Sequence, residues 1–214
     1  MQVDDIVSSI WGDVEKTWQW MTQGRGRIDR LSLWVGPAAS SQPNRLVRIS
    51  KTGEVGLLEG AQKDPMVEQS DVELGHHLTI VDPSLLSSGL AESWREIAVT
   101  EGNSSWRKLT GRRPTFLSEG VISETNTVRD FVQVSGRVVG IVSEISIETM
   151  SKLAETAHGA GVSSLKLRCK MDPDMQPKLQ SSIDRELKQY ESDSEPSCGF
   201  ITEVGDGFAI CLEA

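Results

Sequence analysis

The side chains best suited to chemistry in this sequence are four cations that lie close together. Residues 103–118 contain no acid, and Gly111 and Pro114 predict a loop there rather than a helix. The four cations are Arg107, Lys108, Arg112 and Arg113, and they are flanked by Trp106 and Phe116. In a chain of net charge −9, this local excess of positive charge predicts a site for an anion: phosphate, an acidic peptide, a lipid headgroup or RNA. The alternative is a solvated loop that pairs with acidic side chains of the same protein.

A second group of side chains has the composition of a metal site but not its spacing. It consists of Asp71, Glu73, His76, His77 and Asp82. Metal-binding histidines usually share one face of a helix, as in H-x-x-x-H. Adjacent histidines at the start of a strand point to opposite faces, so at most one of these two could join a shared site. We therefore expect a loop-to-strand junction here, and no metal or other cofactor.

The three cysteines, Cys169, Cys198 and Cys211, contain no C-x-x-C pair. Their odd number predicts free thiols in a reducing, cytoplasmic compartment. Cys169 lies between Arg168 and Lys170, a setting that favours a thiolate, but we expect its side chain to face the core. His158 lies at a predicted helix end, where a histidine complements the helix dipole. The sequence has no G-x-S-x-G, kinase or phosphate-loop motif, which favours a protein that is not an enzyme.

Tryptophan is unusually frequent, with six residues against one tyrosine. Tryptophan anchors interfaces as well as filling cores. The apolar residues between Asp5 and Gln23 recur at steps of three and four, which predicts an amphipathic helix. We treat residues 1–23 as an N-terminal helix that either docks on the core or forms an arm. As an arm, it would bind a partner protein or a second copy through Trp11, Trp18 and Trp20.

The elements that must position these side chains centre on residues 128–147, the densest apolar and β-branched stretch of the chain. β-Branched side chains are stiff and suit a pleated sheet, and a nearly continuous apolar run predicts burial on both faces. We expect a central strand pair or one long bent strand. Gly136 marks either a turn or a bulge, and Gly140 a bend or a close backbone approach.

The remaining elements predict an α+β fold in which helices pack on one face of a mixed sheet. Before the central stretch, we expect strands at residues 28–35, 45–49, 54–58 and 78–81, and then a helix over residues 82–102. After the central stretch, a helix over 147–158, a strand over 162–170, a helix over 179–190 and a hairpin over 198–213 complete a β-α-β-α-β-β block. We expect residues 24–214 to form one α+β domain, with an N-terminal part at 24–118 and a C-terminal part at 119–214.

Composition narrows the function further. The net charge of −9 argues against a general affinity for nucleic acid or membranes, and no apolar run approaches the roughly 20 residues of a membrane helix. The N-terminal acids do not fit a secretion signal. The leading hypothesis is a non-enzymatic binding or assembly protein that acts through the N-terminal helix and the basic loop at 106–113. The alternatives are a virus-type, matrix-like protein that binds anionic membrane or RNA, and a metal- or thiol-dependent enzyme using His76, His77, Asp82 or Cys169.

Overall fold

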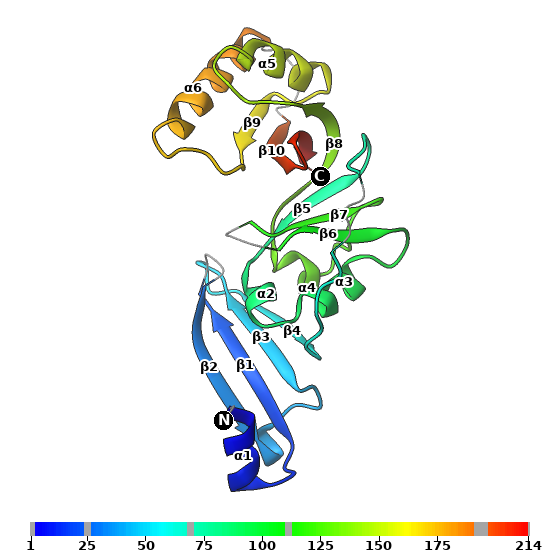
Figure 1. Ribbon diagram of the computed structural model, residues 1–214, viewed down its shortest axis with the longest axis vertical. Helices are drawn as coiled ribbons and strands as arrows, with labels where there is room; N and C mark the ends of the chain where they lie inside the picture. Colours follow the sequence, from blue (N-terminus) through cyan, green and yellow to red (C-terminus); the bar gives the residue numbers. More distant parts are fainter. Residues whose placement is uncertain (1–2, 24–26, 68–70, 110–112, 191–196, 214) are drawn as a thin grey trace.

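The predicted α+β class is confirmed. The computed structural model describes residues 3–23, 27–67, 71–109, 113–190 and 197–213, and these residues form two mixed sheets and six α-helices. Figure 1 shows an elongated molecule with the four-stranded sheet at one end and the seven-stranded sheet in the middle. The helices α5 (Met150–Gly159) and α6 (Gln176–Leu187) lie at the opposite end. No helix in the described ranges is long and apolar enough to cross a bilayer.

The four-stranded sheet follows a short helix, α1 (Val3–Trp11), and has the strand order β2-β1-β3-β4. Its strands are β1 (Lys16–Thr22), β2 (Ile28–Val35), β3 (Asn44–Ile49) and β4 (Val55–Gly60), and a 3-10 turn, η1 (Gly36–Ala38), follows β2. β1 is antiparallel to β2 and parallel to β3. β3 and β4, which correspond to the strands expected at 45–49 and 54–58, form an antiparallel hairpin.

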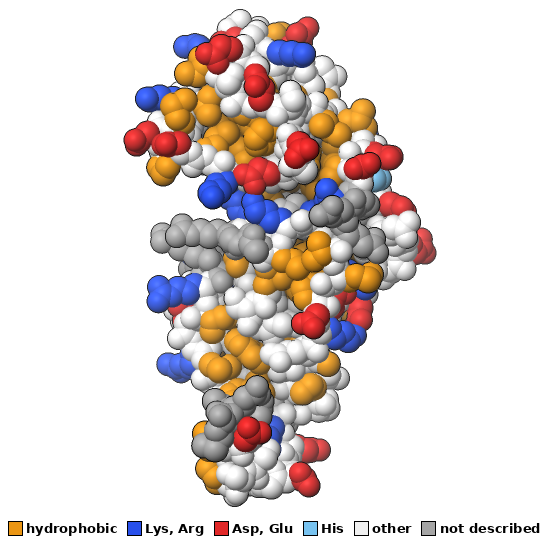
Figure 2. Space-filling model, in the orientation of Figure 1, with side chains coloured by type: hydrophobic (Ala, Val, Ile, Leu, Met, Phe, Trp, Pro, Cys, Tyr) orange, Lys and Arg blue, Asp and Glu red, His pale blue; other side chains and the backbone are white. Residues whose placement is uncertain are grey.

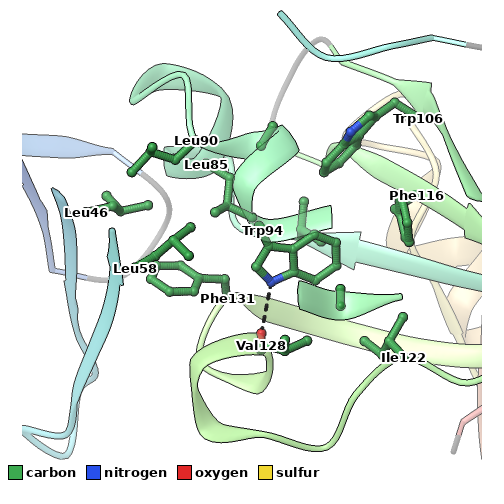
Figure 3. Packing of buried hydrophobic residues seen from close by; sticks show 13 residues of the cluster. Leu46, Leu58, Leu85, Leu90, Trp94, Trp106, Phe116, Ile122, Val128 and Phe131 are labelled. Carbon is green, nitrogen blue, oxygen red and sulfur yellow. Dashed lines mark hydrogen bonds between the residues drawn. The ribbon is translucent and has the colours of Figure 1, made fainter. Parts of the chain in front are cut away.

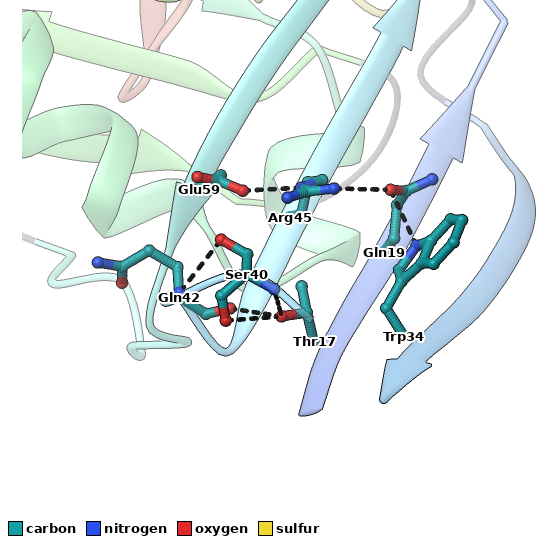
Figure 4. A network of polar contacts seen from close by, with 7 residues as sticks. All are labelled: Thr17, Gln19, Trp34, Ser40, Gln42, Arg45 and Glu59. Carbon is teal, nitrogen blue, oxygen red and sulfur yellow. Dashed lines mark hydrogen bonds and ion pairs between the residues drawn. The ribbon is translucent and has the colours of Figure 1, made fainter. Parts of the chain in front are cut away.

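A row of polar side chains crosses all four strands of this sheet (Figure 4). Arg45 on β3 is paired with Glu59 on β4, with 2.7 Å between Nε and Oε1. The Oε1 atom of Gln19 on β1 accepts hydrogen bonds from Arg45 Nη1 at 3.5 Å and from Trp34 Nε1 on β2 at 3.1 Å. Thr17 fastens the loop after η1, because its hydroxyl donates to the carbonyl of Gln42 at 2.9 Å.

The predicted helix over residues 5–23 is wrong beyond Trp11. α1 ends there, Gly12 adopts a left-handed φ of 61°, and residues 16–22 form β1. Trp18 and Trp20 therefore lie on a strand. The segment KTWQWMT is rich in threonine and tryptophan, which favour strands, and β1 gains backbone partners on both sides. Pairing in a sheet thus outweighs a helical spacing that the same residues also satisfy.

The seven-stranded sheet has the order β6-β7-β5-β8-β11-β10-β9. Its strands are β5 (His77–Val81), β6 (Ser104–Lys108), β7 (Thr115–Ser118), β8 (Val132–Val142), β9 (Ser164–Leu167), β10 (Cys198–Val204) and β11 (Gly207–Glu213). Neighbouring strands are antiparallel except β9 and β10, which are parallel. β8 is the middle strand, so of the two arrangements expected within residues 128–147 the single long strand is present. It is limited to Val132–Val142, and Val128 lies in a short helix over Asn126–Arg129.

Gly136 and Gly140 both lie inside β8, where the sheet leaves little room for a side chain. A Cβ atom on Gly136 would lie 2.5 Å from the carbonyl oxygen of Leu212, and one on Gly140 would lie 3.0 Å from Thr156 Cγ2. The ladder between β8 and β11 shifts register between Ile210 and Cys211. A close backbone approach is therefore present at Gly136, where a turn or a bulge was expected, whereas the atoms nearest to Gly140 belong to side chains. Neither glycine forms a turn.

Two further predictions need correction. The helix expected over 82–102 is two helices, α2 (Ser84–Ser87) and α3 (Ala91–Ala98), separated by Gly89 with a φ of 71°. The expected loop over 103–118 contains the paired strands β6 and β7. Burial explains this difference, because Trp106 and Phe116 lie opposite each other in that ladder and are both fully buried.

One hydrophobic cluster joins the two sheets (Figure 3). Leu46 and Leu58 enter it from the four-stranded sheet, and Trp106 and Phe116 from the seven-stranded sheet. Trp94 on α3 packs between them, with its ring centroid 5.3 Å from that of Phe116. Its Nε1 donates to the carbonyl of Val128, a residue of α4 (Asn126–Arg129), at 3.2 Å.

The C-terminal half of the sheet carries a second cluster. α5 and α6 pack together here, and a short 3-10 turn, η2 (Lys188–Tyr190), follows α6. Ile201 and Ile210 from the sheet, with Leu153 and Ile183 from the helices, are fully buried in it. The order β8, α5, β9, α6, β10, β11 confirms the predicted β-α-β-α-β-β block.

Candidate anion-binding surface

Three cations follow one another on alternate residues along β9 and the segment after it. Burial alternates strictly from Leu165 to Lys170: Leu165, Leu167 and Cys169 are buried, whereas Lys166 and Lys170 are exposed and Arg168 is half-buried. Alternate residues of an extended chain point to the same face and lie about 6.6 Å apart. The main-chain N–H of Arg168 donates to the carbonyl of Ile201 at 2.8 Å, so the pairing with β10 continues past the end of β9. Lys166 and Arg168 thus lie on one face at the edge of the sheet, and Lys170 completes this row after a bend of the chain at Cys169.

The two ends of the β6–β7 hairpin reach this row, although they are distant in sequence. Lys108 Nζ lies 2.5 Å from Glu203 Oε2 on β10, and Arg113 Nη1 donates to the carbonyl of Cys169 at 2.9 Å. The other carboxylate oxygen of Glu203 accepts the main-chain N–H of Lys170 at 2.6 Å. Lys108 and Arg113 therefore join the β9 row, and we call these five cations the basic surface: Lys108, Arg113, Lys166, Arg168 and Lys170.

Figure 2 shows lysine and arginine side chains gathered where the α5–α6 end meets the middle of the molecule. Within the basic surface, the carboxylate of Glu203 pairs with Lys108 and accepts the main-chain N–H of Lys170. Burial raises the pKa of Glu203, but the hydrogen bonds from Lys108 and from the N–H of Lys170 outweigh it and hold that pKa below its usual value. Its charge therefore offsets that of Lys108. The Nε atom of Arg168 is buried and has no hydrogen-bond acceptor among the described residues.

The structure brings together only part of the predicted basic loop. Lys108 and Arg113 belong to the basic surface, Arg107 lies half-buried in β6, and Arg112 is outside the described residues. Sequence reasoning missed Lys166, Arg168 and Lys170. The signal was present in the segment LKLRCK, where a base follows each apolar residue with the period of a strand.

The three tryptophans predicted to bind a partner do not share one surface of a helix. Trp11 is on α1 and is 48% exposed. Trp18 and Trp20 are half-buried in β1, and Trp20 packs against the cluster that joins the two sheets. A partner could therefore reach Trp11 readily, whereas Trp20 already serves the protein's own core.

The histidine and acid group is spread along β5. His77 begins this strand, whereas Asp82 follows its last residue and pairs with Arg48 Nε at 3.2 Å. His76 accepts the main-chain N–H of Glu73 at its Nδ1 atom, 3.2 Å away. Burial, with smaller effects of Arg137 and His76, lowers the pKa of His77. No group of three or more histidine, cysteine or acidic residues within the described ranges could hold a metal ion.

The cysteines and His158 are in settings that do not activate a nucleophile. Burial raises the pKa of Cys169 to about 11, and it also raises that of Cys211. Both thiols therefore stay protonated near neutral pH, whereas a nucleophilic cysteine needs a lowered pKa. Cys198 is exposed. His158 stacks on Tyr190 with 4.8 Å between the ring centroids.

Two cavities of about 400 Å³ each lie outside the basic surface. One is lined by the ends of α5 and α6 and includes Asp184 and Lys188, and the other is lined by the end of β8 and the start of α5 and includes Glu144 and Lys152. Each cavity thus contains one carboxylate and one lysine, which cancel in charge. Neither gathers groups of one chemical type as the basic surface does.

The comparisons with known proteins show a likeness of fold. No protein-family model matches the sequence, and no curated protein matches it. A candidate methyltransferase from Porphyromonas gingivalis W83 has a similar structure, with a TM-score of 0.50 and 12% identity over 98% of this chain. The match covers 48% of that protein, so this chain spans about half of its length.

Two other solved structures are more distant. TrmN from Thermus thermophilus matches with a TM-score of 0.38 and 9% identity, over 64% of this chain and 45% of its own. A possible methylase from Clostridium difficile 630 matches with a TM-score of 0.35 and 11% identity, over 64% of this chain and 40% of its own.

Proposed function

We propose that this chain is a non-enzymatic binding protein that holds the phosphate backbone of RNA on the basic surface. The observation that carries the proposal is the meeting of two distant basic segments, through the 2.9 Å contact of Arg113 with Cys169 and the pairing of Lys108 with Glu203. Lys108 and Arg113 thereby lie beside the segment that carries Lys166, Arg168 and Lys170, in a protein whose net charge is −9. Phosphate contacts by lysine and arginine supply most of the affinity of proteins for nucleic acid without regard to sequence.

The arrangement of the cations favours a chain-like anion over a flat one. Lys166, Arg168 and Lys170 follow one another along the edge of the sheet, and Lys108 and Arg113 lie beside the end of this segment through their contacts with Glu203 and Cys169. A linear row can follow successive phosphates of one strand. A bilayer instead presents a broad negative surface, which would repel the acidic remainder of the chain. The same comparison counts against the matrix-like, membrane-binding alternative.

The side chains of the basic surface also indicate whether it would distinguish one RNA sequence from another. Its five members are all cations, and none of them is an aromatic ring on which a base could stack. Contacts to phosphates position a nucleic acid but carry no direct sequence information. We therefore expect binding with little sequence preference and with strong dependence on salt. The likeness to the Porphyromonas gingivalis protein is one of fold.

The test is fluorescence anisotropy with a labelled 20-nucleotide polyuridine RNA, measured from 50 to 200 mM salt. The variant Lys166→Glu plus Lys170→Glu should weaken binding about tenfold or more. It should also reduce the slope of log Kd against log salt by about 1.4, since each phosphate contact to a single strand contributes about 0.7. The matched control is Lys51→Glu plus Lys152→Glu, which changes the net charge equally at exposed positions elsewhere.

Two further measurements test whether the basic surface binds RNA rather than lipid. Glu203→Gln should tighten binding, because it removes the carboxylate that offsets Lys108. Sedimentation with vesicles of phosphatidylserine and phosphatidylcholine distinguishes lipid from RNA. Equal weakening by the two double variants would overturn the proposal, and so would retention on the vesicles without measurable RNA binding.

A further inference from the structure

The outer edge of β2 has no pairing partner within the described residues. β2 is an edge strand of the four-stranded sheet, and all of its residues except Asp29 pair with β1, on one side only. β4, the opposite edge strand, also packs against α3 and α4. An unpaired edge is a template for another strand, and proteins usually blunt such an edge with charge, proline or a bulge.

The second half of β2 carries none of these protections. Residues 31–35 read LSLWV, with no charged residue and no proline. The one irregularity of the β1–β2 ladder lies at its far end, between Met21 and Thr22. Leu31 is 53% exposed and Trp34 is 39% exposed. The indole Nε1 of Trp34 donates a hydrogen bond to Gln19 on the neighbouring strand β1, which fixes the position of this side chain on β2 (Figure 4).

We infer that β2 is a homodimer interface, in which the strand pairs antiparallel with β2 of a second copy of this chain. The observation that selects a second copy is the self-complementarity of the strand about Ser32. In that arrangement Leu31 lies opposite Leu33 of the other copy, and Arg30 lies opposite Trp34. Apolar cross-strand pairs stabilise a sheet, and a cation beside an indole ring is attracted to it.

The neighbouring alignments are less favourable. Pairing centred on Arg30 would place two arginines opposite each other, which destabilises a ladder. Pairing centred on Leu31 would place Asp29 opposite Leu33 inside the ladder, whereas pairing centred on Ser32 places Asp29 opposite Val35 at its end. Pairing centred on Leu33 would use only residues 31–35 and would leave Arg30 without a partner in β2 of the other copy. Pairing centred on Ser32 uses residues 29–35, nearly the whole strand, and joins two four-stranded sheets into one continuous sheet.

The first test is the mass of the protein in solution, measured by light scattering after size exclusion over a series of concentrations. The wild-type chain should shift from its monomer mass of 23.5 kDa to twice that value as its concentration rises. Leu31→Lys should abolish the shift, because it places a charge in the paired edge. Leu57→Lys is the matched control, since Leu57 is a similarly exposed leucine on β4 and should leave the dimer intact.

The second test is a cross-link at the centre of the proposed pairing. In a Cys198→Ser background, which removes the exposed native thiol, Ser32→Cys should form an intermolecular disulfide, because opposed residues of an antiparallel pair lie within disulfide reach. Val55→Cys on β4 should not. The inference is overturned by a monomer at every concentration, by a dimer that survives Leu31→Lys, or by a dimer that Ser32→Cys fails to cross-link. Circular dichroism would confirm that each variant is folded.

Discussion

At the scale of single residues, His77 couples the burial of one side chain to the stability of the whole chain. Burial, with Arg137 and His76, lowers its pKa in the folded state, whereas an unfolded histidine binds a proton near pH 6.5. As the pH falls through 6.5, the unfolded chain gains a proton that the folded chain resists. The stability associated with His77 is therefore present above about pH 6.5 and is lost as the pH falls toward its folded pKa.

We predict that His77→Gln reduces the loss of unfolding free energy as the pH falls below about 6.5. Urea unfolding at pH 7.5, 6.5 and 5.5 should show a smaller loss of unfolding free energy in the variant than in the wild type. The exposed His158 provides a control variant, His158→Gln. Identical pH dependence in wild type and His77→Gln would contradict the prediction.

At the scale of elements, the position of β8 in the middle of the sheet depends on a glycine. A Cβ on Gly136 would lie 2.5 Å from the carbonyl oxygen of Leu212 and 3.0 Å from Phe200 Cε1. Both neighbours are in strands of the same sheet, and the first is backbone, so neither can move without disturbing the ladder. We predict that Gly136→Ala lowers the free energy of unfolding by about 1–3 kcal/mol.

Chemical denaturation measures this effect, and Gly120→Ala is the control because no atom lies within 4 Å of its added Cβ. Only the Gly136 variant should be destabilised beyond about 1 kcal/mol. An equal effect at both positions would mean that chain flexibility, rather than the close approach inside β8, determines the loss.

At the scale of the whole molecule, Arg48 and Asp82 hold the two sheets together by an ion pair. Arg48 is on β3, whereas Asp82 follows β5, and the side chain of Asp82 is 3% exposed. Removing one partner of a buried pair leaves the other charge without compensation, which costs up to 3–5 kcal/mol. Arg48 is partly exposed, so we predict that Arg48→Met costs about 2 kcal/mol.

Thermal and urea unfolding measure this cost, and the double variant Arg48→Met plus Asp82→Asn should recover part of it by removing the unpaired charge. Arg45→Met is the matched control. Arg45 pairs with Glu59 inside one sheet, both side chains are partly exposed, and its loss should cost less than about 1 kcal/mol. Similar losses of unfolding free energy in Arg45→Met and Arg48→Met would contradict the prediction that the ion pair between the two sheets contributes more than the pair within one sheet.

The sequence by itself determined the elements whose periodicity is unambiguous. The β-branched stretch around β8 and the C-terminal β-α-β-α-β-β order were predicted correctly, because burial of these segments imposes one spacing along the chain. The segment after Trp11 was ambiguous, since Trp18 and Trp20 satisfy both a helical stripe and a strand composition. There the backbone partners of β1 decided the outcome.

Only the tertiary structure decided which side chains meet. Four bases could be recognised in residues 103–118, but the sequence could not place Lys108 beside Glu203, 95 residues away, or Arg113 beside Cys169. These contacts depend on the order and curvature of seven strands, which are set by the packing of side chains on the sheet faces. Short-range spacing along the chain carries no record of that packing, so the basic surface and the open edge of β2 became visible only in the folded molecule.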